Sequence, residues 1–362
     1  MEKLIYIKKE ILKNFLEKIS KDYDVYLPIQ DKKNGIINFG NINILNENYI
    51  MNLKEKTRQS PKFLFFPPYE SLFEFEYKKD IKNPELTEIA LSKPSNSNIR
   101  KKVIFGIKPC DVRGIDCVDL VFSSGNNKDL YYLNKRENTI IISIGCSVVY
   151  PDCFCTSVGG SPFNFGNANI GLLDIGSDLI VMKLDESEKT KQFIIDNNDF
   201  FEKKDMDNET ENKINEIILQ SNKICNANWE KINPENVAAK MVNTFKEDTL
   251  WQEITKKCIS CAACTYVCPT CVCFNIADEQ KDKNGERYRC WDFCTNYYYT
   301  LEASGHNPRE KIYQRYRNKI NCKYNYFIKR NKELYCVGCG RCIDVCPVGM
   351  DIREIVSSII GF

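Results

Sequence analysis

The chain has 362 residues, of which 51 are basic and 49 acidic, and its formal net charge is +2. This length suits two or three domains, and the balanced charge argues against nucleic acid or an acidic membrane surface as partner. No apolar stretch approaches the roughly 18 to 20 residues that span a bilayer, and the mixed charges at the N-terminus do not resemble a secretory signal. We therefore expect a cytoplasmic protein, in which the nineteen cysteines are ligands or buried thiols rather than disulfides.

Residues 1–185 are predicted to form an α/β domain. Apolar residues at helical spacing in 8–21 indicate a helix, and 23–27 resembles a short strand that Pro28 would stop. Further apolar runs, bounded by turn residues or charges as buried strands usually are, lie at 63–66, 103–107, 140–144 and 179–182. Together, these elements indicate a sheet covered by helices.

Thiols follow two of these predicted strands at the point where each strand ends. Cys110 comes just after 103–107 and Cys146 just after 140–144, while Cys153 and Cys155 follow seven and nine residues beyond Cys146. Ligands gather at the carboxyl ends of parallel strands, so we expect these four thiols to hold a third [4Fe–4S] cluster, with Cys117 as an alternative fourth ligand. The alternative is that they are buried small hydrophobic residues, as free cysteines often are.

Residues 186–254 form a highly charged connector that is predicted to be mainly helical. Amphipathic helices are expected over 214–219 and 237–254, the second leading into the next domain. Earlier in the chain, the segment 158–179 contains five glycines, Gly159, Gly160, Gly166, Gly171 and Gly176. Without a G-x-G-x-x-G after a strand, this segment is a weak dinucleotide signal, and we interpret it as a loop over the third cluster.

Residues 255–362 carry two matched cysteine runs, each with the spacing C-x2-C-x2-C-x3-C-P. This is the spacing of bacterial two-cluster ferredoxins, in which the fourth cysteine of each run reaches the other cluster. The spacing therefore assigns one [4Fe–4S] cluster to Cys258, Cys261, Cys264 and Cys346, and the other to Cys336, Cys339, Cys342 and Cys268. Zinc sites instead use separated C-x2-C pairs, and disulfide frameworks suit short secreted chains. We predict a ferredoxin-like α+β domain that transfers electrons.

An insert of 67 residues, 269–335, separates the two cysteine runs. It contains the only histidine of the chain, and we consider a further metal site made of Cys271, Cys273, Cys294 and His306. The alternative is that these residues simply pack beside the clusters. Within 281–330, twelve basic residues face five acidic ones. These cations would tune the clusters, steer an acidic partner or form a solvated helix face.

With these motifs in place, the chain resembles the beta subunit of the cytosolic sulfhydrogenases and, more distantly, the 4Fe–4S electron-transfer subunit of anaerobic sulfite reductase. The resemblance covers nearly the whole length. It is carried by SPK at 60–62, FFP at 65–67, FGIKPCD at 105–111, DCFCTS at 152–157, CPTCVC at 268–273, WDFC at 291–294, GHN at 305–307 and the two cysteine runs. The stretch around Cys146, GCSVVYPD, is closer to the sulfhydrogenase branch. Four cysteines fall outside the family pattern and are interpreted as structural: Cys117, Cys225, Cys290 and Cys322.

The resemblance implies a non-catalytic iron–sulfur subunit of an anaerobic oxidoreductase complex. Its implied partners are a flavoprotein that binds FAD and NAD(P)H and a catalytic redox subunit, with ferredoxin as a further candidate. The family pattern also has cysteine at the four positions of the expected third cluster, and cysteine or histidine at the four positions of the insert. The alternative is a self-contained iron–sulfur enzyme that acts on a small sulfur compound. A single histidine and no recognisable acid–base set argue against that alternative.

Overall fold

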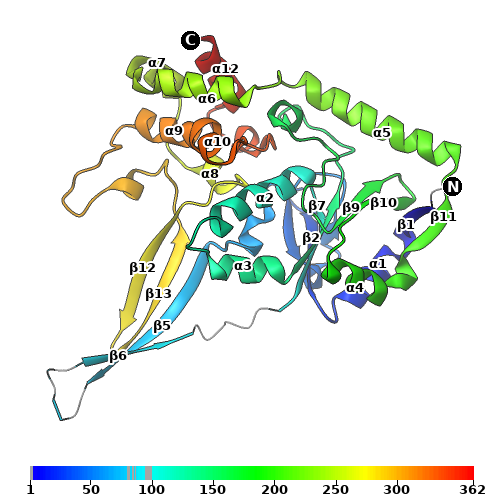
Figure 1. The fold of residues 1–362 in the computed structure, drawn as a ribbon, viewed down its shortest axis with the longest axis horizontal. Coiled ribbons are helices and arrows are strands. Elements are labelled where there is room, and N and C mark those ends of the chain that lie inside the picture. Colours follow the sequence, from blue (N-terminus) through cyan, green and yellow to red (C-terminus); the bar gives the residue numbers. More distant parts are fainter. Residues whose placement is uncertain (1–2, 80–81, 84, 86, 94–99) are drawn as a thin grey trace.

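The computed structural model describes residues 3–362 except 80–81, 84, 86 and 94–99. Among these residues the strands form two sheets, a large one in the N-terminal half and a smaller one that projects from the body as an arm (Figure 1). Helices cover the large sheet, and the C-terminal helices gather at one end of it. The prediction of a mixed α/β fold is confirmed.

The large sheet has nine strands in the order β11-β1-β10-β9-β8-β7-β2-β3, with β4 also paired to β2. Their bounds are β1 Lys3–Lys8, β2 Asp24–Asp31, β3 Ile37–Asn41, β4 Tyr49–Met51, β7 Lys102–Ile107, β8 Thr139–Ile144, β9 Ile170–Asp174, β10 Asp178–Leu184 and β11 Glu202–Asp205. The central strands β2, β7, β8 and β9 are parallel, and the outer pairs are antiparallel. The expected parallel pairing of the strands that precede Cys110 and Cys146, β7 and β8, is therefore confirmed.

Each face of this sheet carries its own apolar core because successive residues of a strand point to opposite faces. On one face, Phe105 packs with Phe15 of α1 (Leu12–Ile19) and with Phe193 of α4 (Glu188–Asp196). On the other, Ile104 packs with residues of α2 (Pro109–Ser123) and α3 (Leu130–Glu137). The sheet is thus the middle of three layers, and α2 begins where β7 ends.

Two sequence predictions in this half are wrong. The run 63–66 is not a strand, because Pro61–Leu64 forms a short 3-10 helix whose first residue is proline, a residue suited to the start of a helical turn. Nor does Pro28 end β2, which continues to Asp31. Because β2 has left β7 after Tyr26, the missing N–H of Pro28 costs no bond to that neighbour.

The small sheet joins two distant parts of the sequence. Its strand order is β12-β13-β5-β6, with bounds β5 Tyr69–Lys79, β6 Thr87–Ser92, β12 Phe274–Lys281 and β13 Asn284–Trp291. Strand β13 of the insert pairs antiparallel with β5 of the N-terminal part over residues 284–290. The insert between the cysteine runs therefore shares a sheet with the N-terminal half.

The remaining helices form the connector and the C-terminal part. They are α5 Asn208–Ala227, α6 Pro234–Asn243, α7 Asp248–Thr255, α8 Ala263–Tyr266, α9 Ile312–Asn321, α10 Phe327–Asn331, α11 Arg341–Asp344 and α12 Ile352–Gly361, with a π-helix at Cys322–Tyr326 between α9 and α10. Short 3-10 helices lie at Lys9–Ile11, Ile42–Ile44, Cys155–Val158, Asn198–Phe200, Thr244–Lys246 and Tyr297–Thr300. Apolar residues of α6, α7, α9 and α12 share one core around Trp251. None of the helices in the described ranges combines the length and apolar character needed to cross a bilayer.

Candidate iron–sulfur sites

The first of three thiol-lined cavities lies at the loop of the first cysteine run. Four thiols line it, those of Cys258, Cys261, Cys264 and Cys346. Ser260 and Ala262 take positive φ angles of 59° and 63°, and the Ser260 N–H donates to the Cys258 sulfur at 3.4 Å. Left-handed backbone costs a residue with a side chain about 1–2 kcal/mol. Cys261 is exposed, so this cavity lies close to the protein surface.

The second cavity lies at the loop of the second run, which has the same backbone shape. Four thiols line it, those of Cys336, Cys339, Cys342 and Cys268. Here the left-handed positions are glycines, Gly338 with a φ of 66° and Gly340 with a φ of 74°. The fourth thiol of each run therefore lies in the cavity of the other run, in the arrangement that the spacing predicts.

The third cavity lies at the carboxyl ends of β7 and β8. It is lined by the four thiols singled out in the sequence, Cys110, Cys146, Cys153 and Cys155, and by Cys225. Cys110 is in the first turn of α2, directly after β7, and Cys146 follows β8. Because the two strands are parallel neighbours, their ends bring the two thiols to one edge of the sheet. Two residues of the glycine-rich loop, Ser161 and Pro162, also line this cavity.

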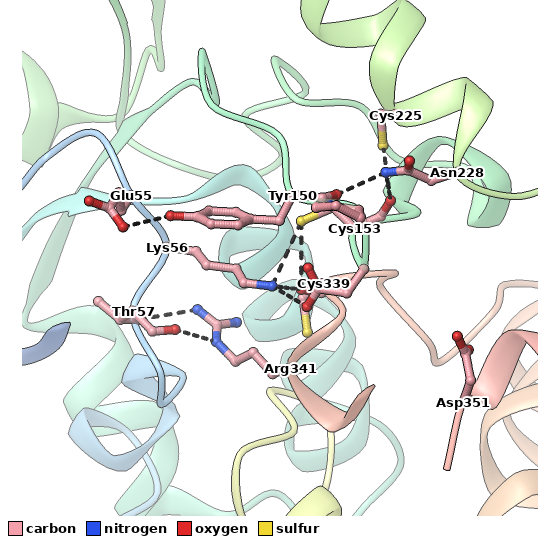
Figure 2. A network of polar contacts seen from close by, with 12 residues as sticks. Glu55, Lys56, Thr57, Tyr150, Cys153, Cys225, Asn228, Cys339, Arg341 and Asp351 are labelled. Carbon is pink, nitrogen blue, oxygen red and sulfur yellow. Dashed lines mark hydrogen bonds and ion pairs between the residues drawn. The ribbon is translucent and has the colours of Figure 1, made fainter. Parts of the chain in front are cut away.

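Polar contacts hold the 150–155 loop against the rest of the third cavity (Figure 2). The Lys56 ammonium pairs with Asp152 and lies 3.9 Å from the Cys153 sulfur and 3.3 Å from the Cys339 carbonyl oxygen. On the other side, the Asn228 amide donates to the Cys153 carbonyl at 2.7 Å. The loop is thus tied both to the second cysteine run and to the end of α5.

Sequence reasoning missed Cys225, which lies in the last turn of α5 and is fully buried. Its sulfur is 3.5 Å from that of Cys155. The hydrogen bond from the Cys155 thiol is the main cause that lowers the pKa of Cys225 to about 6, and the same bond, with burial, raises the pKa of Cys155. No signal in the sequence pointed to Cys225, because it lies 70 residues from Cys155 in a charged helix.

The three cavities form a row in which neighbours share walls. Gly338 and Cys339 line both the third and the second cavity. Cys264, Cys342 and Lys319 line both the second and the first. Between the third and second cavities, the Arg341 guanidinium makes two bonds to the Asp111 carboxylate, at 2.7 and 2.6 Å, and both side chains are fully buried.

Each cavity offers the donor set that a [4Fe–4S] cluster requires, because such clusters are held by four cysteine thiolates. In the part of the chain that the structure describes, no three Cys, His, Asp or Glu side chains lie close enough to hold a single metal ion. The cubane is wider than one ion, so thiols that surround it stand further apart. The residues present therefore fit a cluster better than a zinc ion.

The comparisons with known proteins agree with this donor set. Residues 257–350 match the family model of the 4Fe–4S dicluster domain, which supports the presence of iron–sulfur clusters. Over 360 residues, the chain is 30% identical to sulfhydrogenase 2 subunit beta of Pyrococcus furiosus, covering 98% of each chain. The chain belongs to the sulfhydrogenase beta-subunit family. The resemblance inferred from the motifs is thus confirmed, and membership is consistent with electron transfer through iron–sulfur clusters.

Buried lysines surround the cavities of this sulfhydrogenase-family chain. Lys62, Lys319 and Lys323 are each 3% exposed. Lys62 donates to the carbonyls of Cys268 and Cys271 at 2.9 and 2.7 Å, and burial lowers its pKa to about 8. For Lys319, burial opposes the charged form, but neighbouring groups, the Cys264 thiolate first among them, outweigh it and raise the pKa. A bound four-thiolate cluster is anionic, so these cations and amide donors would tune its potential.

The structure brings together only part of the predicted site in the insert of this sulfhydrogenase relative. Cys273 lies beside Cys294, and a hydrogen bond from Cys294 is the main cause that lowers the pKa of Cys273 to about 6. Cys271 is buried and hydrogen-bonded to Cys268 instead. His306 is exposed on a turn, where its amide bonds Ser304 and its carbonyl accepts from Glu302. The metal site with His306 stays a prediction.

Proposed function

We propose that this chain is the iron–sulfur electron-transfer subunit of a multi-subunit cytosolic oxidoreductase of the sulfhydrogenase type. In this proposal it relays electrons between a flavoprotein subunit, which binds FAD and NAD(P)H, and a catalytic redox subunit. The nineteen cysteines support a cytosolic location, because every one of them lies in the described ranges as a free thiol.

The observation that carries this proposal is the row of three thiol-lined cavities with shared walls. We assign one [4Fe–4S] cluster to each cavity, with ligands from Cys258, Cys261, Cys264 and Cys346 in the first, and from Cys336, Cys339, Cys342 and Cys268 in the second. The third takes its four ligands from the thiols at the ends of β7 and β8 and on the loop that follows. When bound, such clusters accept and release one electron at a time, whereas a flavin exchanges electrons with NAD(P)H as a pair.

The chain's own residues provide what a relay needs. Thiol-bearing loops from both halves hold the cofactors, and the buried lysines offset the negative charge of the thiolates. The Asp111–Arg341 pair fixes the third cavity relative to the second cysteine run. At one end of the row Cys261 is exposed, and at the other Val148, which lines the third cavity, is 42% exposed. Two exposed ends suit one partner at each end.

The first experiment is to measure iron and acid-labile sulfide per chain after anaerobic purification, with low-temperature EPR of the reduced protein. We expect about twelve irons in the wild type, since each cluster contains four. Cys110→Ala should lower this to about eight while both ferredoxin-type signals remain, and Cys258→Ala should remove a different signal. About eight irons in the wild type would restrict the relay to the C-terminal pair of cavities.

A second measurement separates a relay from a self-contained enzyme. The purified chain, reduced by viologen dye, should pass electrons to its partner subunits but should show no turnover with sulfite or polysulfide alone. This expectation follows because no acid–base set is evident near the thiols among the residues that the structure describes. Sustained turnover by the chain alone would contradict the relay proposal, whatever its iron content.

A further inference from the structure

The third cavity contains more thiols than one cluster needs. Cys110, Cys146, Cys153, Cys155 and Cys225 all line it, whereas a [4Fe–4S] cluster takes four thiolates. The sulfurs of Cys155 and Cys225 are 3.5 Å apart, which is contact distance for two sulfur atoms. Thiolates bound to different corners of a cubane diverge from one another. A pair in contact instead suits two thiols that serve the same corner.

The pair is a built feature, because several bonds hold the end of α5 against the 150–158 loop. The Asn228 side chain donates to the carbonyls of Tyr150 and Cys153 at 2.8 and 2.7 Å. The Ser157 hydroxyl donates to the Trp229 carbonyl at 2.7 Å, and the Ile232 N–H donates to the Ser157 carbonyl at 2.9 Å. Cys225 is fully buried. The helix end and the loop therefore move as one unit, which keeps the two sulfurs together.

We propose that Cys225 is an alternative ligand of the third cluster and exchanges with Cys155 at one iron. While either residue ligates as the thiolate, the other stays a protonated thiol that donates its S–H to the bound sulfur. In the exchange, the bond from iron to the Cys155 sulfur breaks and the bond to the Cys225 sulfur forms. One proton passes from the Cys225 thiol to Cys155, and no electron moves. The inference rests on the third cluster of the proposed function.

The test compares iron content among four alanine variants of the full chain, purified anaerobically. Cys155→Ala and Cys225→Ala should each keep about twelve irons per chain, because the remaining thiol takes the corner. The double variant should fall towards eight. Cys146→Ala is the matched control and should also fall, since the inference gives Cys146 no substitute. In every variant, the EPR signals of the two ferredoxin-type clusters report whether the fold is intact.

The EPR spectrum adds a readout that does not depend on how well Cys155→Ala folds. In Cys225→Ala, the signal of the third cluster should shift in g-values and midpoint potential, because the ligating sulfur loses an S–H donor. An unchanged signal in Cys225→Ala, or a Cys155→Ala variant as poor in iron as Cys146→Ala, overturns the inference and leaves the relay intact. A wild type with about eight irons overturns the third cluster itself and this inference with it.

Discussion

The two C-terminal cavities and the third cavity bring thiols together by different means. Each C-terminal cavity takes three thiols from one seven-residue stretch and a fourth from the partner run. The third takes its thiols from the start of α2, the end of β8, the 150–155 loop and the end of α5. Local spacing therefore defines the first kind of site, whereas tertiary structure defines the second.

This difference extends to the backbone of the two cysteine runs. The first run tolerates Ser260 and Ala262 in left-handed conformations. At the equivalent position of the second run, a Cβ on Gly338 would lie 2.5 Å from the backbone of Phe154, and one on Gly340 would meet the backbone of Asp152. The second run needs glycine because the loop of the third cavity packs directly on it. The third site thus depends on contacts that the first site does not make.

The largest expected effect comes from breaking the contact that links the two kinds of site. Asp111→Asn should destabilise the protein by about 3–5 kcal/mol, because it leaves the fully buried Arg341 guanidinium without a counter-charge. The midpoint of anaerobic urea unfolding, followed by circular dichroism, measures this. Iron should be lost from the third site before the first.

Two control variants show whether the effect is specific to the buried charge. Replacing both partners, as Asp111→Leu with Arg341→Met, should recover much of the stability, since apolar substitutes for a buried pair are often neutral. Glu188→Gln breaks the exposed Lys191–Glu188 pair, whose side chains are 55% and 91% exposed, and should change stability by less than about 0.5 kcal/mol. Equal losses in Asp111→Asn and Glu188→Gln would contradict the role given to the buried pair.

A glycine substitution tests whether the second run supports the third site. Gly338→Ala and Gly349→Ala both place a side chain at a φ of 66°, which costs about 1–2 kcal/mol. Only Gly338→Ala also forces the 154–155 backbone to move, because nothing lies within 4 Å of a Cβ on Gly349. Gly338→Ala should therefore lose iron from the third site, and Gly349→Ala should not. The same iron content in both variants would show that the two sites do not depend on this contact.

Residues close together in the sequence could be predicted well, and residues joined only by folding could not. The eight ferredoxin-type thiols follow from spacing, and the pairing of Cys110 with Cys146 follows from two apolar strands that end at the same edge. Cys225 could not be predicted, because its position depends on where a charged helix returns to the sheet. The role of β5 in the insert's sheet was also hidden, since β5 and β13 lie about 200 residues apart and neither carries a pairing signal.

A pH-dependent effect is expected on the helix that carries Cys110. Burial raises the pKa of Asp116 to about 6 from an ordinary 3.8. Between pH 4 and 6 the folded state therefore holds more protons than the unfolded state, so stability falls as pH rises through this range and stays lower above it. Asp116→Asn should gain on the order of 1 kcal/mol at pH 7.5, and the gain should shrink towards pH 5.5.

Urea unfolding of this variant at pH 5.5, 6.5 and 7.5 measures the effect. The control is Asp119→Asn, three residues on, which loses its ion pair with Arg136 and should be destabilised at all three values. Iron at the third site should be unchanged in Asp116→Asn, because Asp116 does not line that cavity. A gain that does not depend on pH would rule out the buried carboxylate as its cause.

The smallest expected effect concerns the potential of the third cluster relative to the other two. Lys56 is the cation next to Cys153, its side chain is 14% exposed, and it also contacts the Cys339 carbonyl. Lys56→Met removes that charge and leaves the Asp152 carboxylate unpaired, so the midpoint potential of the third cluster should fall by tens of millivolts, where about 59 mV is a tenfold change for one electron. Lys54→Met, at an exposed position two residues away, is the matched control. An EPR-monitored redox titration should show the largest fall at the third cluster, a smaller one at the second and none at the first. Equal shifts at all three would mean that Lys56 acts through the overall charge of the protein and not through its contact with the third site.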